Sequence, residues 1–178
     1  MKVNWWALAL LGIMALGVVA CDGGETPEPD DNGLTYAERL KRDVDSLKVY
    51  LDDHLDSIRT VHNNPDLDYQ EDSTGLMWIV YEEGAGPFAQ DGDIAYTYYR
   101  GSLMNGAVFD QNLDGLPFQF TVASSGVIQG WNIGIKKFQA GTRGYLFLPS
   151  PLAYGTQSQG TIPANSILIF NMEVVELR

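Results

Sequence analysis

The sequence predicts an α+β protein in which a curved antiparallel β-sheet wraps around one short helix and a long N-terminal helix precedes the sheet. Two patterns predict this fold. Apolar residues recur every three or four positions over residues 35–61, whereas short alternating runs rich in β-branched and aromatic residues fill the chain beyond residue 73. A run of strands with one isolated helix is typical of an antiparallel sheet that curves around that helix.

The composition argues against several classes of function. The chain of 178 residues has a formal net charge of −12, from 23 acidic and 11 basic residues. A nucleic-acid-binding protein needs a basic surface to displace counterions from phosphates, so we expect no nucleic-acid partner. One cysteine and two histidines are too few for a disulfide framework, a metal centre or a catalytic triad. We therefore expect no metal and no cofactor.

Residues 1–20 are typical of a secretory signal peptide. A lysine precedes an apolar run over residues 5–19, which is shorter than the roughly 20 residues that a membrane span needs. The letters VVAC at residues 18–21 resemble a bacterial lipobox. This resemblance implies that Cys21 is the lipid attachment site and the mature N-terminus, so that the protein is anchored to the cell envelope. An uncleaved N-terminal anchor is the alternative.

Residues 21–33 form an acidic tether in this interpretation. Within residues 22–33 there are five acids, three glycines and two prolines but no aliphatic or aromatic side chain, so the segment has nothing to bury. An acidic cluster after a lipidated cysteine resembles the surface-export signals of some Bacteroidetes lipoproteins; a solvated spacer is the alternative. We expect the protein at the outer membrane or the cell surface, with the leaflet left open.

Residues 34–72 are predicted to be a helical segment, with a helix over residues 35–61. Thr35 and Glu38 have the spacing of a capping box at its start. The apolar stripe of this helix comprises Leu40, Val44, Leu47, Leu51, Leu55 and Ile58. The stripe could pack on the domain that follows, form a homodimer seam with a second copy, or receive a partner protein. We interpret His54 and His62 as surface residues.

Residues 73–178 form the predicted sheet domain. Strands are expected over residues 76–83, 93–103, 117–122, 142–148 and 166–177, and turns rich in glycine, asparagine and aspartate separate them. A short helix is expected over residues 131–138. Because the strand pattern begins near Leu76, we expect residues 73–178 to fold without the preceding helix.

Short motifs in this region resemble the FKBP-type peptidyl-prolyl cis–trans isomerases. They are YRG at 99–101, NG at 105–106, VFD at 108–110, PFQF at 117–120, VIQGW at 127–131, GTR at 141–143, AYG at 153–155 and IP at 162–163. They occur in order over about 76–178. The resemblance implies the FKBP-like fold and isomerisation of Xaa-Pro bonds, here in exported or envelope proteins.

The resemblance also implies an aromatic cleft that binds proline-containing polypeptides. The residues that it implies for catalysis are Tyr99, Phe109, Asp110, Ile128, Trp131, Tyr154 and Phe170, and those for substrate binding are Val127, Ile162 and Phe120. Trp131 would form the floor, and the Ile128 N–H and the Tyr154 hydroxyl would hold substrate carbonyls. The family implies macrolide inhibitor binding as well, although Leu152 stands where a tyrosine is common and the 112–116 loop lacks a basic residue.

The implied reaction needs no proton transfer. Rotation about an amide faces a barrier of about 18–20 kcal/mol because resonance is lost in the twisted state. A dry aromatic cleft disfavours the planar ground state, whose dipole is larger, relative to the twisted state. This suits a domain without histidine or cysteine. The alternatives are an FKBP-like module that holds proline-containing chains with little turnover, and a structural lipoprotein that uses its helix for assembly.

Overall fold

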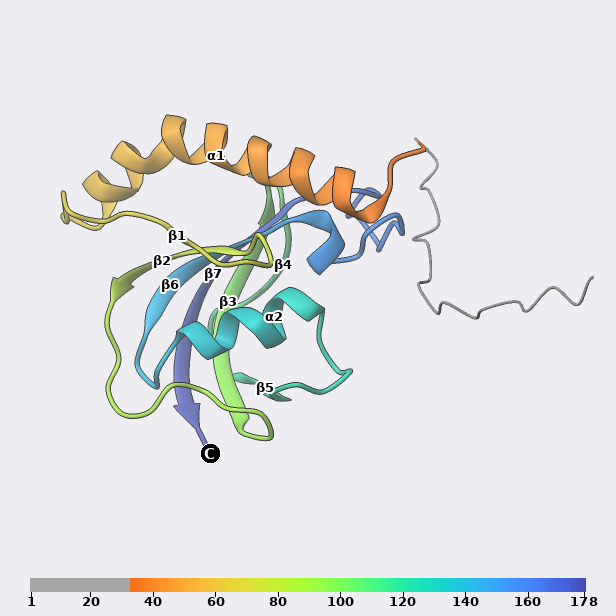
Figure 1. The fold of residues 1–178 in the computed structure, drawn as a ribbon. Helices are drawn as coiled ribbons and strands as arrows, with labels where there is room; N and C mark the ends of the chain where they lie inside the picture. Colours follow the sequence, from red (N-terminus) through yellow and green to blue (C-terminus); the bar gives the residue numbers. More distant parts are fainter. Residues whose placement is uncertain (1–32) are drawn as a thin grey trace, which may run out of the picture.

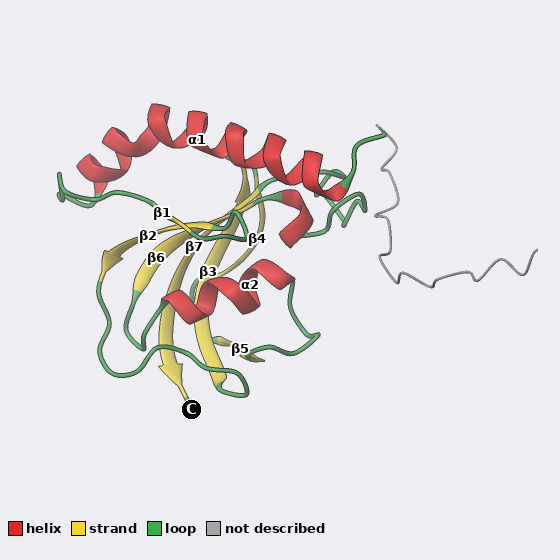
Figure 2. Ribbon diagram, in the orientation of Figure 1, coloured by secondary structure: helices red, strands yellow, loops and turns green. Residues whose placement is uncertain are grey.

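The computed structural model describes residues 33–178, so the signal peptide, Cys21 and all of the tether except Gly33 lie outside the described residues. Figures 1 and 2 show the fold, coloured by sequence and by type of element. The elements are α1 (Tyr36–Val61), β1 (Gln70–Glu71), β2 (Met77–Glu82), β3 (Ile94–Leu103), β4 (Val108–Asn112), β5 (Phe118–Thr121), α2 (Gln129–Gly134), β6 (Arg143–Leu148) and β7 (Leu168–Leu177). Two short 3-10 helices, Ile135–Lys137 and Ser150–Leu152, complete the chain.

The strands form one antiparallel sheet in the order β1-β2-β6-β7-β3-β4, and β5 pairs with β3. The two ten-residue strands, β3 and β7, pair along almost their whole lengths, from Ala95 opposite Leu177 to Leu103 opposite Leu168. The sheet curves around α2, which lies against its concave face (Figure 1). The predicted fold class is therefore confirmed.

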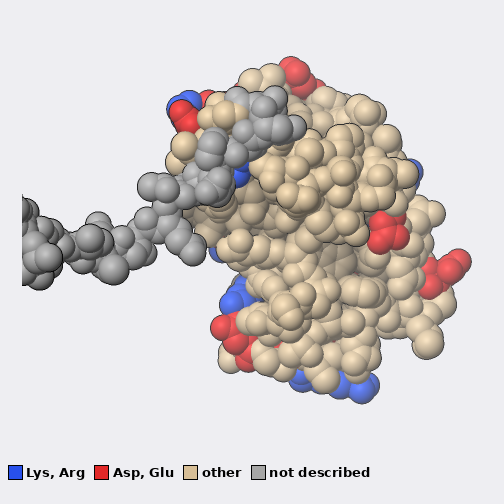
Figure 3. All heavy atoms as spheres, turned by 90° about the vertical axis from the view of Figure 1, so that its right-hand side faces the viewer, with Lys and Arg blue, Asp and Glu red and all other residues tan. Residues whose placement is uncertain are grey.

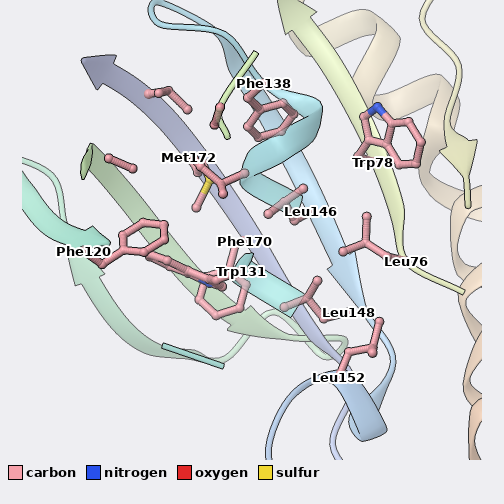
Figure 4. Packing of buried hydrophobic residues seen from close by; sticks show 14 of the residues in the cluster. Leu76, Trp78, Phe120, Trp131, Phe138, Leu146, Leu148, Leu152, Phe170 and Met172 are labelled. Atoms are coloured by element: carbon pink, nitrogen blue, oxygen red, sulfur yellow. The ribbon is translucent and has the colours of Figure 1, made fainter. Parts of the chain in front are cut away.

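The main hydrophobic core lies between α2 and the concave face of the sheet. Figure 4 shows side chains from both layers meeting there, among them Trp131 of α2, Leu146 and Leu148 of β6 and Phe170 of β7. Two helix glycines permit this close packing. A Cβ atom on Gly130 would lie 2.6 Å from Leu148, and one on Gly134 would lie 2.5 Å from Leu146. A larger residue at either position would therefore force the facing leucine of β6 to shift.

A second hydrophobic cluster lies between α1 and the convex face of the sheet. Leu47 and Leu51 of α1 are fully buried in it with Met77, Ile79 and Phe147 of the sheet. Burial of one leucine contributes about 1.5–3 kcal/mol. Of the three uses that the sequence left open for the apolar stripe, the structure shows packing on its own domain. A homodimer seam through the same stripe would require α1 to leave the sheet.

The helix α1 begins with the capping box that the sequence predicts. The Thr35 hydroxyl accepts a hydrogen bond from the Glu38 backbone N–H at 3.3 Å, and the Glu38 carboxylate accepts one from the Thr35 N–H at 2.8 Å. The capping box therefore holds two of the backbone N–H groups that have no partner within the helix. Within residues 33–178, no helix is both long and apolar enough to span a membrane.

Some elements differ from the sequence-based expectation. The strands β1 and β4 were not predicted, because one has two residues and the other is an exposed, largely polar edge strand beside a bulge. The short helix begins two residues earlier than expected and ends as a 3-10 helix. The two histidines, both interpreted as surface residues, differ in burial. The ring of His62 stacks on Tyr81 at 3.8 Å and is half-buried, whereas His54 is exposed.

Candidate functional site

An aromatic cavity of about 200 Å³ opens beside α2, between the concave face of the sheet and the loop that precedes the helix. Its lining residues are Tyr99, Phe109, Asp110, Phe118, Gly126, Val127, Ile128, Trp131, Tyr154 and Phe170. They come from β3, β4, β5, α2, β7 and two loops. Charged side chains lie mainly at the margins of the face shown in Figure 3.

The floor of the cavity is the indole of Trp131, which is only 4% exposed. Its ring meets the rings of Tyr99 and Phe170 edge to face, at centroid distances of 4.9 and 5.2 Å. Edge-to-face contacts place the positive edge of one ring against the negative face of another, which favours a fixed arrangement. The Trp131 Nε1 atom is buried without a hydrogen-bond partner within the described residues. The floor is therefore a rigid apolar surface.

Gly101 of β3 makes room for the aromatic wall. Phe109 and Phe170 meet beside it edge to face, with ring centroids 5.6 Å apart. A Cβ atom at position 101 would lie 2.5 Å from the Phe109 ring and 2.9 Å from the Phe170 ring. Any larger residue would push at least one of these rings out of place.

The loop that carries Val127 and Ile128 is held by the side chain of Asn132 in α2. Asn132 accepts a hydrogen bond from the Ala123 N–H at 2.9 Å and donates one to the Ser124 carbonyl at 2.8 Å. Ile128 lies directly before the first residue of α2, in an extended conformation. Within the described residues its backbone N–H has no hydrogen-bond acceptor. This amide is available to a bound carbonyl group.

The polar side of the cavity is formed by Tyr99, Asp110 and Tyr154. The Tyr99 hydroxyl donates a hydrogen bond of 2.6 Å to the Asp110 carboxylate. Burial, together with the neighbouring carboxylate, raises the pKa of Tyr99 well above its usual range, so its hydroxyl remains a donor. Tyr154 is 36% exposed and lies at the opening.

The structure brings together most of the residues that the sequence predicted for the site. Eight of the ten line the cavity, whereas Phe120 and Ile162 lie in the core outside its lining, 6% and 5% exposed. Two lining residues, Phe118 and Gly126, were missing from the expected site. Phe118 and Phe120 both contact Trp131 and share one face of β5, so alternation along the strand does not separate them. Gly126 precedes Val127 in the sequence, and nothing in the local sequence pattern marks it as a lining residue.

A larger hollow, of about 640 Å³, shares Tyr99 with the aromatic cavity, but its lining is mostly polar. It is bordered by the ion pairs of Arg143 with Glu82 and Glu173 and by the stacked rings of His62 and Tyr81. It has no buried apolar floor comparable to Trp131. The aromatic cavity, unlike this hollow, therefore combines an apolar lining with a buried floor.

Comparison with known proteins agrees with the geometry. A family model described as FKBP-type peptidyl-prolyl cis-trans isomerase matches residues 86–175. The chain belongs to the FKBP family. The match includes the aromatic cavity from Tyr99 to Phe170 and lies wholly C-terminal to α1.

Curated FKBP relatives match more than half of the chain. FK506-binding protein 4 of Mycosarcoma maydis is 42% identical over 105 residues, which is 59% of this chain and 28% of that protein. The FKBP-type isomerase FkpA of Buchnera aphidicola is 38% identical over 112 residues, 62% of this chain and 44% of that protein. The chain thus matches less than half the length of these relatives.

Two solved FKBP structures share the fold. AtFKBP13 superposes with a TM-score of 0.59 at 31% identity, covering 62% of this chain and 99% of that one. FkpA from Escherichia coli superposes with a TM-score of 0.60 at 29% identity and covers 79% of this chain and 63% of that one. The predictions of the FKBP family and of its curved sheet around a short helix are therefore confirmed.

Proposed function

We propose that this FKBP-family protein is a peptidyl-prolyl cis–trans isomerase that acts on Xaa-Pro bonds of exported or envelope proteins. One observation carries the proposal: side chains from distant parts of the sequence converge on a single apolar cavity with a buried indole as its floor. A proline ring is an apolar body attached to a polar amide. The cavity offers aromatic surface to the ring and hydrogen-bond donors at its edge to the amide.

Catalysis in this cleft follows from differential binding. The planar amide has a large dipole that water stabilises, and the twisted amide has lost much of it. Moving the amide from water onto Trp131, Phe109 and Phe170 therefore disfavours the planar form more than the twisted form. Xaa-Pro bonds exchange over tens to hundreds of seconds without a catalyst, so even partial lowering of the barrier is useful to a folding chain.

Orientation is the second contribution. The free Ile128 N–H and the Tyr154 hydroxyl are donors for substrate carbonyl groups on either side of the bond that rotates. Holding the chain at two points lets one part rotate against the other without loss of position. The Asp110 carboxylate accepts a hydrogen bond from the Tyr99 hydroxyl and thereby holds the Tyr99 ring in the wall of the cleft. No step in this mechanism transfers a proton.

The location of the protein is part of the proposal. The signal-like residues 1–20, the lipobox-like residues 18–21 and the acidic segment 22–33 support lipid attachment at Cys21 and tethering of the FKBP domain to the bacterial envelope. Such a domain would meet polypeptides as they emerge across the membrane. The relatives called FK506-binding protein support macrolide binding in the same cleft.

A protease-coupled proline isomerisation assay with short Xaa-Pro peptides tests the activity. We expect the purified mature chain to accelerate cis-to-trans exchange and an added macrolide such as FK506 to compete with the peptide. Binding of the peptide without acceleration would instead support the holding module. Neither binding nor turnover would contradict both functions.

A further inference from the structure

A buried carboxylate connects α1 to the loop that carries Tyr154. Asp43 of α1 is 2% exposed, and its Oδ2 atom accepts a hydrogen bond of 2.8 Å from the backbone N–H of Ser150. The guanidinium group of Arg42, which is partly exposed, forms an ion pair of 2.8 Å with the other carboxylate oxygen of Asp43. A buried charge is costly unless it is paired and hydrogen-bonded, and both conditions are met here. This contact joins residues 107 positions apart in the sequence.

Ser150 in turn anchors the turn around Tyr154. Its carbonyl oxygen accepts hydrogen bonds from the N–H groups of Ala153 and Gly155, at 3.0 and 2.9 Å. Tyr154 lies between these two donors, so its backbone position is set by the position of Ser150. Gly155 is held on its other side, where its carbonyl accepts the Asn165 N–H at 2.7 Å. The ring of Tyr154 then lines the cleft.

We propose that Asp43 is a positioning residue for the isomerase reaction, acting through Ser150 to hold Tyr154 at the mouth of the cleft. The proposal rests on the proposed function. A charge-assisted hydrogen bond is stronger and shorter than a neutral one, so Asp43 fixes Ser150 more firmly than solvent would. The family match begins at residue 86, whereas Asp43 lies in the helix that precedes it. The N-terminal helix therefore contributes to the cleft from outside the matched region.

The kinetic test compares Asp43→Ala in two backgrounds, the natural chain and Tyr154→Phe. Because Asp43 reaches the cleft only through Ser150 and Tyr154, Asp43→Ala should lower kcat/KM by less than the full contribution of a hydrogen bond to a charged group, between about three- and tenfold in the natural background. If Asp43 acts through the Tyr154 hydroxyl, the same substitution should change kcat/KM by less than about twofold in Tyr154→Phe. An equal loss in both backgrounds would overturn the proposal, since it would show a general effect on the fold.

Two further variants separate positioning from folding. Asp43→Asn keeps an oxygen that can accept the Ser150 N–H and should restore most of the kcat/KM lost in Asp43→Ala. If Asp43→Ala does not fold, Asp43→Leu, which fills a similar volume but has no acceptor for the Ser150 N–H, replaces it in the cycle with Tyr154→Phe. Asp45→Ala is the matched control, because Asp45 lies on the solvent side of α1 and pairs with Lys41. Activity lost equally in Asp45→Ala would contradict the proposal.

A readout that does not depend on turnover distinguishes this proposal from the proposed function. In nuclear magnetic resonance spectra of the natural chain, the Ser150 amide should exchange slowly with solvent. Asp43→Ala should accelerate that exchange and shift the signals of Tyr154 and Gly155, and Asp45→Ala should leave them unchanged. If the natural chain has no isomerase activity but these signals respond, the proposed function fails while the coupling holds. Unchanged Tyr154 and Gly155 signals in Asp43→Ala would overturn the coupling.

Discussion

The hydroxyl of Tyr99 in β3 lies 2.6 Å from the carboxylate of Asp110 in β4 and donates a hydrogen bond to it. The two strands pair antiparallel, with Tyr99 opposite Asn112 and Gly101 opposite Asp110. The bond therefore joins neighbouring strands diagonally at the polar side of the cleft. It also gives Asp110 a partner within the cleft wall, in a chain whose 112–116 loop has no basic residue.

Replacing Tyr99 by Phe should keep the aromatic wall and remove this hydrogen bond. We expect kcat/KM to fall a few-fold, because Asp110 loses its donor and the ring loses its restraint. The raised pKa of Tyr99 means that its stabilising effect is full below the ordinary tyrosine pKa of about 10 and declines as the pH rises above it. Urea unfolding at pH 8 and 10.5 should show a smaller alkaline loss in Tyr99→Phe; an equal loss would contradict the assignment.

Removing the floor of the cleft should cost more activity than any change at its edge. Trp131→Ala should lower kcat/KM by about tenfold or more and destabilise the fold by about 3–5 kcal/mol, because the cavity grows and the rings around it lose support. Trp131→Phe keeps an aromatic floor and should lose less. Trp78→Phe is the control, since Trp78 lies in the same core cluster away from the cleft. It should change stability but leave kcat/KM near that of the natural chain.

The helix α1 should contribute to the stability of the sheet domain. Leu47→Ala and Leu51→Ala should each lower the free energy of unfolding by about 2–5 kcal/mol, because both side chains are fully buried against the sheet. Val49→Ala, at a position 63% exposed, should change it by less than about 0.5 kcal/mol. The fragment 73–178 should unfold at lower urea concentration than the chain with its helix. Equal midpoints would show that the helix is dispensable.

The stability of the protein should fall at mildly acidic pH because of His62. Burial against Tyr81 lowers the pKa of His62 below its usual value. The unfolded chain then binds a proton more readily than the folded one, so stability is full above about pH 6.5 and decreases as the pH falls below it. His62→Phe keeps the stacking and should lose this part of the pH dependence. His54→Phe, at the exposed histidine stacked on Tyr50, should retain it.

Lipid attachment predicts a specific effect of Cys21→Ser. Metabolic labelling with a fatty acid should mark the natural protein, and the variant should accumulate as an unlabelled precursor. Label retained on Cys21→Ser would contradict attachment at that residue. Isomerase activity of the variant in solution should be unchanged, because the cleft is formed by residues 99–170.

Much of the fold could be predicted because its signals are local. The capping box of Thr35 and Glu38 and the apolar stripe of α1 depend on residues three or four apart, and the predicted strands are bounded by their own turns. The edge strand β4 was missed because it is short, its residues are mostly exposed, and apolar and polar side chains do not alternate clearly along it. Its position depends on pairing with β3 across a bulge, which is a non-local property.

The sequence by itself determined the family and most of the cleft residues. Each family motif is a short run of adjacent residues, and the motifs follow one another in the family's order, so both can be recognised without the structure. Only the tertiary structure decided what each apolar surface meets. An apolar stripe states that burial is favourable but not which surface provides it, so Leu47 could have faced a second copy as well as the sheet. How deeply a side chain is buried likewise depends on all the elements that pack around it, and these come from distant parts of the sequence. Phe118 and Phe120 share a face, yet one lines the cleft and the other lies outside its lining. The bond from Asp43 to Ser150 joins groups that only folding brings together.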